Sequence, residues 1–218
     1  MMNTPHQKPQ SATNRTYLKL HEAIIVGHYT PGHQLKISAL SSELGTGTTP
    51  VREALSLLVS DQLVERIDQR GFWVAKASQQ HFQEVLKLRC QLEALALRDS
   101  IDMATREQDR QVIQSLFVYE NETGNDPQSR RQAHKSFHMA LLKGCGSSIL
   151  LRMCGQLHDL NTRYRYLARQ SDSYPNRNPG AEHHAILAAF LERDSARACN
   201  ALTQHYQTTR IFLPDPFI

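Results

Sequence analysis

The sequence contains few cysteines and no long apolar run. It has four cysteines in 218 residues, Cys90, Cys145, Cys154 and Cys199, and no C-x-x-C pair. This spacing predicts reduced, buried thiols in a cytoplasmic protein. No apolar stretch has the length of a membrane span, and residues 1–14 lack the apolar core of a signal peptide. The sequence therefore predicts neither a membrane protein nor a secreted disulfide scaffold.

The sequence also lacks a strong charge of either sign. Its formal net charge is +4 at pH 7, and 40% of its residues are apolar, with no low-complexity tract. This composition predicts one or two compact domains with apolar cores. Between Arg15 and Ala75 six basic residues are balanced by six acidic ones, so net charge gives no support for nucleic-acid binding there. Such binding must depend on the placement of single cations, and those in this segment include Lys36, Arg52, Arg66 and Arg70.

A helix-turn-helix pattern occupies the middle of this segment. A short helix is expected over Ser38 to Leu44, followed by Gly45-Thr46-Gly47, which has the length of the turn between two such helices. The second helix is expected to begin at Pro50, whose missing N–H costs nothing there, with Thr49 capping the free amides. Glu53 is expected to complete a loose capping pattern.

Two short β-prone segments follow the second helix. They run from Leu63 to Ile67 and from Phe72 to Ala75, and the polar turn Asp68-Gln69-Arg70-Gly71 joins them. Another amphipathic helix is expected over Arg15 to Val26. Three helices and a short β-hairpin make a winged helix-turn-helix. In such a module the second helix of the motif enters the major groove of DNA, and the hairpin tip lies against the backbone or minor groove.

These residues resemble the GntR family of bacterial transcription regulators. The resemblance runs from Pro31-Gly32 through Thr49-Pro50-Val51-Arg52-Glu53-Ala54-Leu55 to Gly71 and Val74. One departure is Gly47-Thr48, where the family usually has serine or threonine followed by arginine, so one phosphate or base contact is absent. The resemblance implies a homodimer that binds double-stranded operator DNA. The residues expected to contact DNA are Lys36, Ser38, Thr46, Thr48, Thr49, Arg52, Arg70 and Gly71.

Beyond Lys76 the sequence predicts long helices only. Their expected ranges are 79–101, 105–122, 128–143, 147–170, 179–193 and 195–212. The expected fold is therefore mainly α: an N-terminal winged helix-turn-helix, then an all-α bundle of about six helices, a fold whose interior commonly hosts ligand and metal sites. The expected organisation is a flexible arm over 1–14, a DNA-binding domain over 15–77 and a helical domain over 78–218.

Four histidines of this bundle could meet around one metal ion. His134 and His138 are four residues apart and share a helix face, a spacing that lets two imidazoles reach one ion. His183 and His205 stand on the last two helices, about ten and eleven residues from the turn between them, so at ~1.5 Å per residue they come level. The alternative is chance, because a chain with 11 histidines often contains such a pair.

The bundle resembles the FadR C-terminal ligand-binding domain, or FCD domain, of one GntR subfamily. Arg89 and Glu93 match in its first helix, as do His138, His183 and His205 in later helices. In metal-binding members an aspartate and three histidines hold the ion, and His134 stands at the aspartate position. The resemblance thus implies a divalent metal, zinc or nickel, held by the four histidines, since neutral imidazole suits these ions. Without a metal, the histidines would form a polar pocket whose charge responds to pH.

Arg89 is the residue expected to hold the effector. The resemblance places an arginine of this helix at the pocket, where its planar guanidinium can hold a carboxylate through two charge-assisted hydrogen bonds. The alternative is an ion pair with Glu93, four residues later. The further candidates, on the fourth helix of the bundle, are Asn161, Arg163 and Tyr164. A solvated face is the alternative for Arg163, Arg165 and Arg169.

The sequence thus predicts a dimeric, cytoplasmic transcription regulator without enzymatic activity. Repression relieved by a small carboxylate effector is the default expectation from the resemblance. Two alternatives stay open: a metal-free regulator that binds a longer acyl ligand, and a metal-dependent hydrolase or lyase fused to a winged helix. Against the enzyme, no aspartate or glutamate stands in the histidine motif where a general base would be placed.

Overall fold

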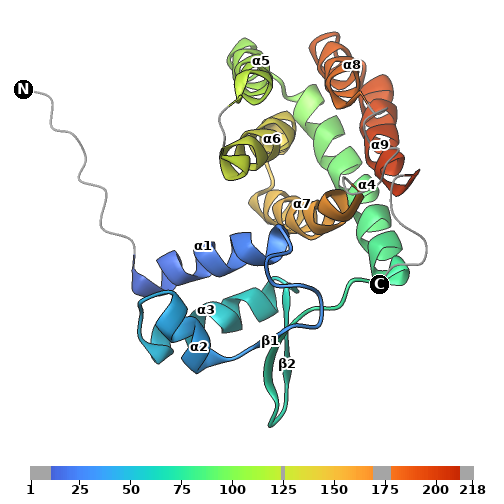
Figure 1. Cartoon of the computed structure of the whole chain (residues 1–218). Helices are drawn as coiled ribbons and strands as arrows, with labels where there is room; N and C mark the ends of the chain where they lie inside the picture. The colour runs from blue at the N-terminus through green and yellow to red at the C-terminus, as the bar shows by residue number, and fades with distance from the viewer. Residues whose placement is uncertain (1–10, 124–125, 169–177, 212–218) are drawn as a thin grey trace, which may run out of the picture. The chain divides into compact units, whose positions relative to one another are not determined.

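The structure, a computed structural model, describes residues 11–123, 126–168 and 178–211. The chain divides into two compact units, residues 1–76 and residues 77–218, which we call unit 1 and unit 2. Figure 1 shows a small sheet beside three helices in unit 1 and helices alone in unit 2. The fold class is the one that the sequence predicts.

Unit 1 combines three helices with a three-stranded antiparallel sheet. The helices are α1 (Ala12–Ile25), α2 (Ile37–Glu43) and α3 (Thr48–Ser60). The strands are β1 (Gln34–Leu35), β2 (Val64–Ile67) and β3 (Gly71–Val74), in the order β1-β3-β2. The β2–β3 hairpin was expected, whereas β1 was not. A strand of two residues has no periodicity to detect, and its pairing with Phe72 and Trp73 is the only sign of it.

All three helices of unit 1 begin earlier than the sequence indicated, and α2 does so by one residue, at Ile37. Residues 1–10 of the expected arm lie outside the described residues, and α1 starts at Ala12 because the Ser11 side chain accepts a hydrogen bond from the Asn14 amide. Helix α3 starts at Thr48 with Gly47 as its N-cap, so the expectation that Pro50 begins the helix after a Thr49 cap is wrong. Proline is tolerated there because first-turn amides lack intrahelical acceptors in any case.

The core of unit 1 lies where α1 packs against α3. Leu20, Val51, Leu55 and Leu58 are completely buried in it. The expected capping role of Glu53 is also wrong, because its carboxylate accepts a hydrogen bond of 2.6 Å from the Thr13 hydroxyl on α1. These contacts hold α3 by one face, and its other face stays exposed.

Unit 2 consists of six α-helices and one short 3-10 helix in its described part. They are α4 (Gln79–Asp102), α5 (Arg106–Asn121), α6 (Pro127–Leu142), η1 (Lys143–Cys145), α7 (Ser148–Ala168), α8 (Pro179–Leu191) and α9 (Ser195–Ile211). Side-chain caps define several starts: Thr105 accepts from the Gln108 amide and Asp126 from the amides of Gln128 and Ser129. Helix α4 packs against both α7 and α9, and α8 packs beside α9. Helix α4 therefore connects α7 with the α8–α9 pair through direct packing.

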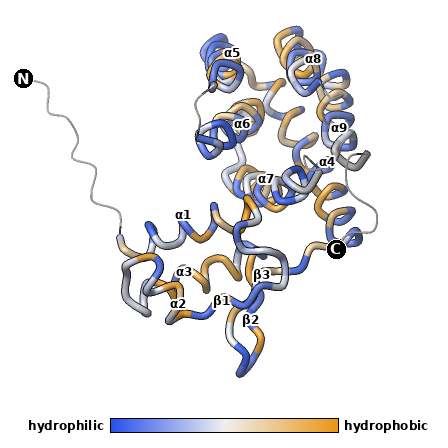
Figure 2. The backbone as a smooth tube through the Cα atoms, in the orientation of Figure 1, coloured by the Kyte–Doolittle hydropathy of each residue, from blue (hydrophilic) through white to orange (hydrophobic). Residues whose placement is uncertain are grey.

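The helices of unit 2 are amphipathic, as Figure 2 shows by the alternation of apolar and polar segments along the tube. Their apolar faces meet in one core that includes Leu97, Leu116, Phe137 and Phe190. No described helix is both long and apolar enough to cross a membrane.

Substitution of Leu55 by alanine should destabilise unit 1. The side chain is completely buried, and its removal would leave a cavity that costs about 2–5 kcal/mol of the free energy of unfolding. Leu57→Ala on the same helix is the matched control, because that side chain is 49% exposed. Urea denaturation followed by circular dichroism measures both. Equal losses in the two variants would contradict the described packing of α3.

Candidate functional site

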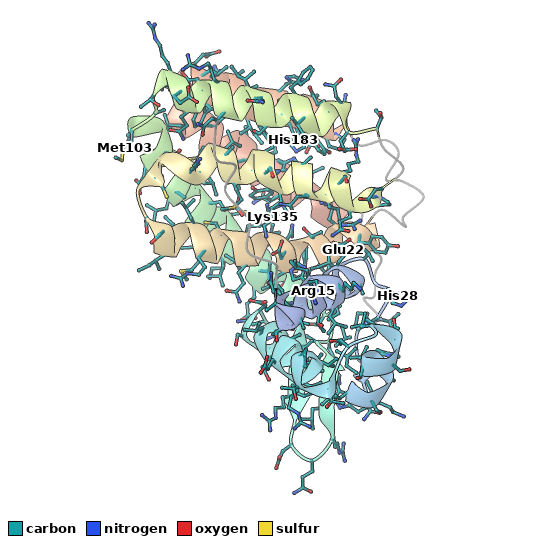
Figure 3. The ribbon with its side chains drawn as sticks, turned by 90° about the vertical axis from the view of Figure 1, so that its left-hand side faces the viewer. Arg15, Glu22, His28, Met103, Lys135 and His183 are labelled. Atoms are coloured by element: carbon teal, nitrogen blue, oxygen red, sulfur yellow. The ribbon has the colours of Figure 1, made fainter. Side chains whose placement is uncertain are left out.

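Four buried histidines meet inside unit 2. His134 and His138 come from α6, His183 from α8 and His205 from α9, and one ring nitrogen of each lies within 4.8 Å of the others. The Nε2 atoms of His134 and His138 are 3.2 Å apart, and the ring centroids of His183 and His205 are 4.7 Å apart. Figure 3 shows His183 among the helices of the bundle, with Met103 at its edge. The structure thus brings together the four histidines that were expected to meet.

Burial keeps two of these imidazoles, His134 and His138, neutral. The pKa values of His134 and His138 are well below the ordinary value, first because burial disfavours the charged ring. Arg165 is the next cause for His134, and the neighbouring His205 is the next for His138. Neutral imidazole is the form that binds a metal.

Outer hydrogen bonds orient two of the rings. Nδ1 of His205 lies 2.6 Å from a carboxylate oxygen of Glu182, and Nδ1 of His138 lies 3.0 Å from the Tyr206 hydroxyl. That hydroxyl donates its own proton to Glu93, so it accepts from the His138 Nδ1–H. In both rings the proton is thus on Nδ1 and the lone pair is on Nε2. Such an arrangement is typical of histidines that bind metal, and the donor set fits zinc or nickel.

Arg89 stands beside this cluster in a buried network. Its Nε atom donates to Glu93 at 2.6 Å, and its guanidinium carbon lies 3.7 Å from the ring centroid of Tyr206. The alternative interpretation, an ion pair with Glu93, is thus correct, but the pair is buried rather than exposed. Within the described residues, Nη2 of Arg89 is buried and has no hydrogen-bond partner. The network leaves one donor of this guanidinium available.

Helix α7 adds two residues that the sequence did not single out. The His158 ring is buried, with its centroid 5.6 Å from that of His134 and 5.8 Å from that of His138. The Nη1 atom of Arg165 lies 2.6 Å and 2.9 Å from the two ring nitrogens of His134. The alternative of a solvated face is wrong for Arg163, which is buried, and Arg165 contacts His134 instead; Arg169 lies outside the described residues. The sequence signal that could have identified both residues is the spacing of His158 and Arg165, since residues seven apart on a helix lie on nearly the same face.

The three effector candidates on α7 are placed differently from one another. Asn161 is buried, and its Oδ1 atom has no hydrogen-bond partner among the described residues. The Tyr164 hydroxyl lies 2.7 Å from Nδ1 of His81 and donates to the Ser78 carbonyl, at the start of α4. Arg163 is buried near the same end of α4, where its charge helps to lower the pKa of His81, second to burial. Tyr164 thus contacts Ser78 and His81 at the start of α4 rather than the four clustered histidines. Its side chain is turned by about 100° from that of Arg165 around the helix axis.

The expected DNA-contacting residues lie at accessible positions of unit 1. On α3, the side chains of Thr48, Thr49 and Arg52 are exposed along the face that does not contact the core. Lys36 and Ser38 are exposed at the start of α2, and Thr46 is half-buried in the turn.

The tip of the β2–β3 hairpin is exposed as well. Gly71 has φ +85°, a conformation that favours glycine, and the preceding Arg70 side chain extends into solvent. The Arg70 carbonyl accepts a hydrogen bond from the Gln34 side chain at 3.2 Å. This hydrogen bond anchors the turn to β1 through the Arg70 backbone, and the Arg70 guanidinium takes no part in it.

Comparison with known families matches each unit separately. Residues 12–74 match the family described as "Bacterial regulatory proteins, gntR family", and residues 84–208 match the "FCD domain". The two matches cover the helix-turn-helix with its hairpin and the bundle with all four histidines.

Curated relatives cover most of the chain. It is 33% identical to the HTH-type transcriptional repressor GlaR of Escherichia coli (strain K12), over 88% of this chain and 91% of that protein. It is 32% identical to the uncharacterized HTH-type transcriptional regulator BphR of Paraburkholderia xenovorans, over 94% of this chain and 86% of that one. The structure of E. coli McbR/YncC shares the fold, with a TM-score of 0.78, 23% identity and coverage of 93% and 97%.

The buried histidines should make the stability of the metal-free protein depend on pH. Burial lowers the pKa of His158 to about 3, although the Asp159 carboxylate partly opposes this. Between that value and the unfolded value near 6.5 the unfolded chain binds more protons, so the free energy of unfolding falls as the pH falls. Each such histidine contributes a slope of about 1.4 kcal/mol per pH unit.

His158→Gln should therefore reduce this slope by about one proton. The control is His184→Gln, because the His184 side chain is 60% exposed. Urea denaturation of chelator-treated protein at several pH values from about 5 to 7 measures the slope. An unchanged slope in the His158 variant would contradict a neutral, buried ring.

Proposed function

Because the chain belongs to the GntR family of bacterial regulatory proteins, with an FCD domain after its DNA-binding domain, we propose that it is a ligand-responsive repressor. It is a DNA-binding transcription regulator and not an enzyme. The relative GlaR is named a transcriptional repressor, which supports repression as the sign of regulation. The proposal adds a homodimer, a metal on the histidines and a small organic-acid effector.

For DNA binding, α3 is the element that enters the major groove. Its exposed face carries Thr49 and Arg52 in the first two turns, where a recognition helix contacts bases and phosphates. The hairpin tip with Arg70 supplies a second cation for the backbone or minor groove. A homodimer would present two such surfaces to the halves of a near-palindromic operator.

For the metal, the four histidines of unit 2 would be the ligands. His138 and His205 each have an outer hydrogen-bond partner at Nδ1, and His183 completes a three-imidazole set. His134 differs, because Arg165 contacts both of its ring nitrogens. A bound divalent ion would supply a positive centre that polarises and holds an acidic ligand.

The observation that carries the effector proposal is the buried Nη2 donor of Arg89, which lies beside the histidines and has no hydrogen-bond partner among the described residues. A buried donor without a partner costs roughly 1–3 kcal/mol, and a ligand carboxylate would remove that cost. On α7, Nε2 of His158 is buried and lacks a partner among the described residues as well. A carboxylate accepting from both groups would lie next to the metal ligands.

Effector control then requires two arrangements of the protein with different affinities for the ligand. A small acid bound beside Arg89 can relieve repression only if it binds the arrangement with low operator affinity more tightly. The proposal therefore assigns recognition of DNA to unit 1 and recognition of the acid to unit 2.

Substitution of Arg52 by alanine should weaken operator binding. Loss of one charged contact to a base or phosphate costs about 1–3 kcal/mol, which is roughly a 5- to 150-fold loss of affinity. Lys19→Ala is the charge-matched control, because Lys19 is exposed on α1 in the same unit. Fluorescence anisotropy with operator DNA at fixed salt measures both. Unchanged affinity and specificity in the Arg52 variant would contradict the assignment of α3 as the recognition helix.

Removal of one central histidine should abolish metal binding. Elemental analysis of protein purified without a histidine tag should find about one zinc or nickel ion per chain, and almost none in His138→Ala or His183→Ala. The neighbour His184 provides the control, because it points out of the bundle and pairs with Glu120 at 2.8 Å. His184→Ala should keep the metal. Metal loss in all three variants, or absence of metal from zinc-treated wild type, would rule out the four-histidine site.

A further inference from the structure

Helix α3, which the proposed function assigns to the major groove, carries no net charge. Between residues 48 and 60 the only cation is Arg52, and the only anion is its direct neighbour Glu53. Both side chains are exposed. Because DNA presents closely spaced negative phosphates, the attraction of the guanidinium is offset wherever the neighbouring carboxylate approaches them. The placement of the Glu53 carboxylate therefore affects how tightly α3 binds DNA.

Glu53 lies near the edge of α3 that is expected to contact DNA. It follows Thr49 by four residues, which places the two side chains within about 40° of each other around the helix axis and ~6 Å apart along it. The opposite side of α3 is buried and carries Val51, Leu55 and Leu58. A glutamate side chain is long and flexible, so its carboxylate at this position can turn toward the DNA backbone or away from it.

Helix α1 supplies the group that holds this carboxylate. In unit 1, α1 packs beside α3 (Figure 1), and the Thr13 hydroxyl on α1 donates to Oε2 of Glu53 at 2.6 Å. One turn later the Tyr17 hydroxyl donates to Oδ2 of Asp61, the C-cap residue of α3, at 2.7 Å. Two hydroxyls of α1 thus hold the two carboxylates of residues 48–61. Both donors are neutral, so they orient the carboxylates without removing their charge.

From this geometry we infer that Thr13 is a positioning residue for DNA binding: its hydroxyl keeps the Glu53 carboxylate turned toward α1 and away from the phosphates near Arg52. The inference rests on the proposed function, because it takes α3 as the recognition helix. It adds that α1 contributes to operator affinity without contacting the operator. Asp61 stands nine residues after Arg52, ~14 Å along the helix, so its partner Tyr17 has no comparable effect.

Operator binding by Thr13→Val tests the inference. Valine keeps the branched shape of threonine and removes the hydroxyl. The probe is a duplex selected by the wild-type protein from random sequences, and fluorescence anisotropy measures the affinity. The variant should bind about fivefold more weakly at low salt, the effect of one repulsive charge pair at ~4 Å in water. The ratio of the two affinities should approach one at high salt, because counterions screen the repulsion.

Three further variants separate electrostatics from structure. The double variant Thr13→Val/Glu53→Gln should recover the wild-type affinity, because glutamine carries no charge. Thr13→Ser should keep it, because serine retains the hydroxyl. Tyr17→Phe is the matched control and should bind like wild type, because it breaks the same kind of bond between α1 and α3 at the far end of α3. Urea denaturation checks that each variant is folded.

Several results would overturn the inference. Equal losses in Thr13→Val and Tyr17→Phe, a loss that is the same at every salt concentration, or no recovery in the double variant would instead indicate general loosening of the α1–α3 contact. Weaker binding by Glu53→Gln alone would show that the carboxylate itself contacts the DNA, as glutamate does with the cytosine amino group.

Arg52→Ala distinguishes this inference from the proposed function. If Arg52→Ala loses affinity and Thr13→Val does not, the inference about Thr13 fails and α3 stands as the recognition helix. If Arg52→Ala binds like wild type, the assignment of α3 fails, and the inference fails with it.

Discussion

The interior of unit 2 depends on one buried carboxylate, that of Glu93. Its two oxygens accept hydrogen bonds from Arg89 and from the Tyr206 hydroxyl, and that hydroxyl accepts in turn from His138. One carboxylate on α4 thereby compensates a buried guanidinium and fixes the tautomer of a histidine on α6. Removal of one partner from such a pair typically costs about 3–5 kcal/mol, because the other charge is left buried and alone. The geometry of the histidine cluster is therefore determined partly by residues that never contact a metal.

The same carboxylate leaves the rest of this interior short of negative charge. Among the buried residues of the described structure Glu93 is the only acid, whereas five histidines and two arginines are buried. A divalent ion on neutral imidazoles would keep its full positive charge, and Arg165 adds another beside His134. Ions of this kind are stable in a low-dielectric interior only when an opposite charge lies near. The Glu182 carboxylate, 2.6 Å from Nδ1 of His205, supplies part of that charge, and an anionic ligand would supply more.

The sequence was sufficient to predict the fold and the meeting of the four histidines, because both depend on local periodicity. Helix spacing places His134 and His138 on one face, and the turn between α8 and α9 brings His183 level with His205. The sequence did not predict very short elements or caps that depend on one side chain. The strand β1 has two residues, and Ser11 caps α1 from a position that resembled a polar arm. Such features depend on partners that are distant in sequence or on single side-chain contacts.

The position of Arg165 shows why residue type alone could not identify the site residues of α7. Arg163 and Arg165 are chemically identical and two residues apart, yet Arg165 contacts His134 and Arg163 lies near His81. About 200° of helix rotation separates them, so the rotational setting of α7 against α4 and α6 decides which guanidinium faces the histidines. That setting follows from packing, with Cys154, His158 and Asn161 buried along one side of the helix. The core packing of α7 thus determines which charged side chains surround the four histidines.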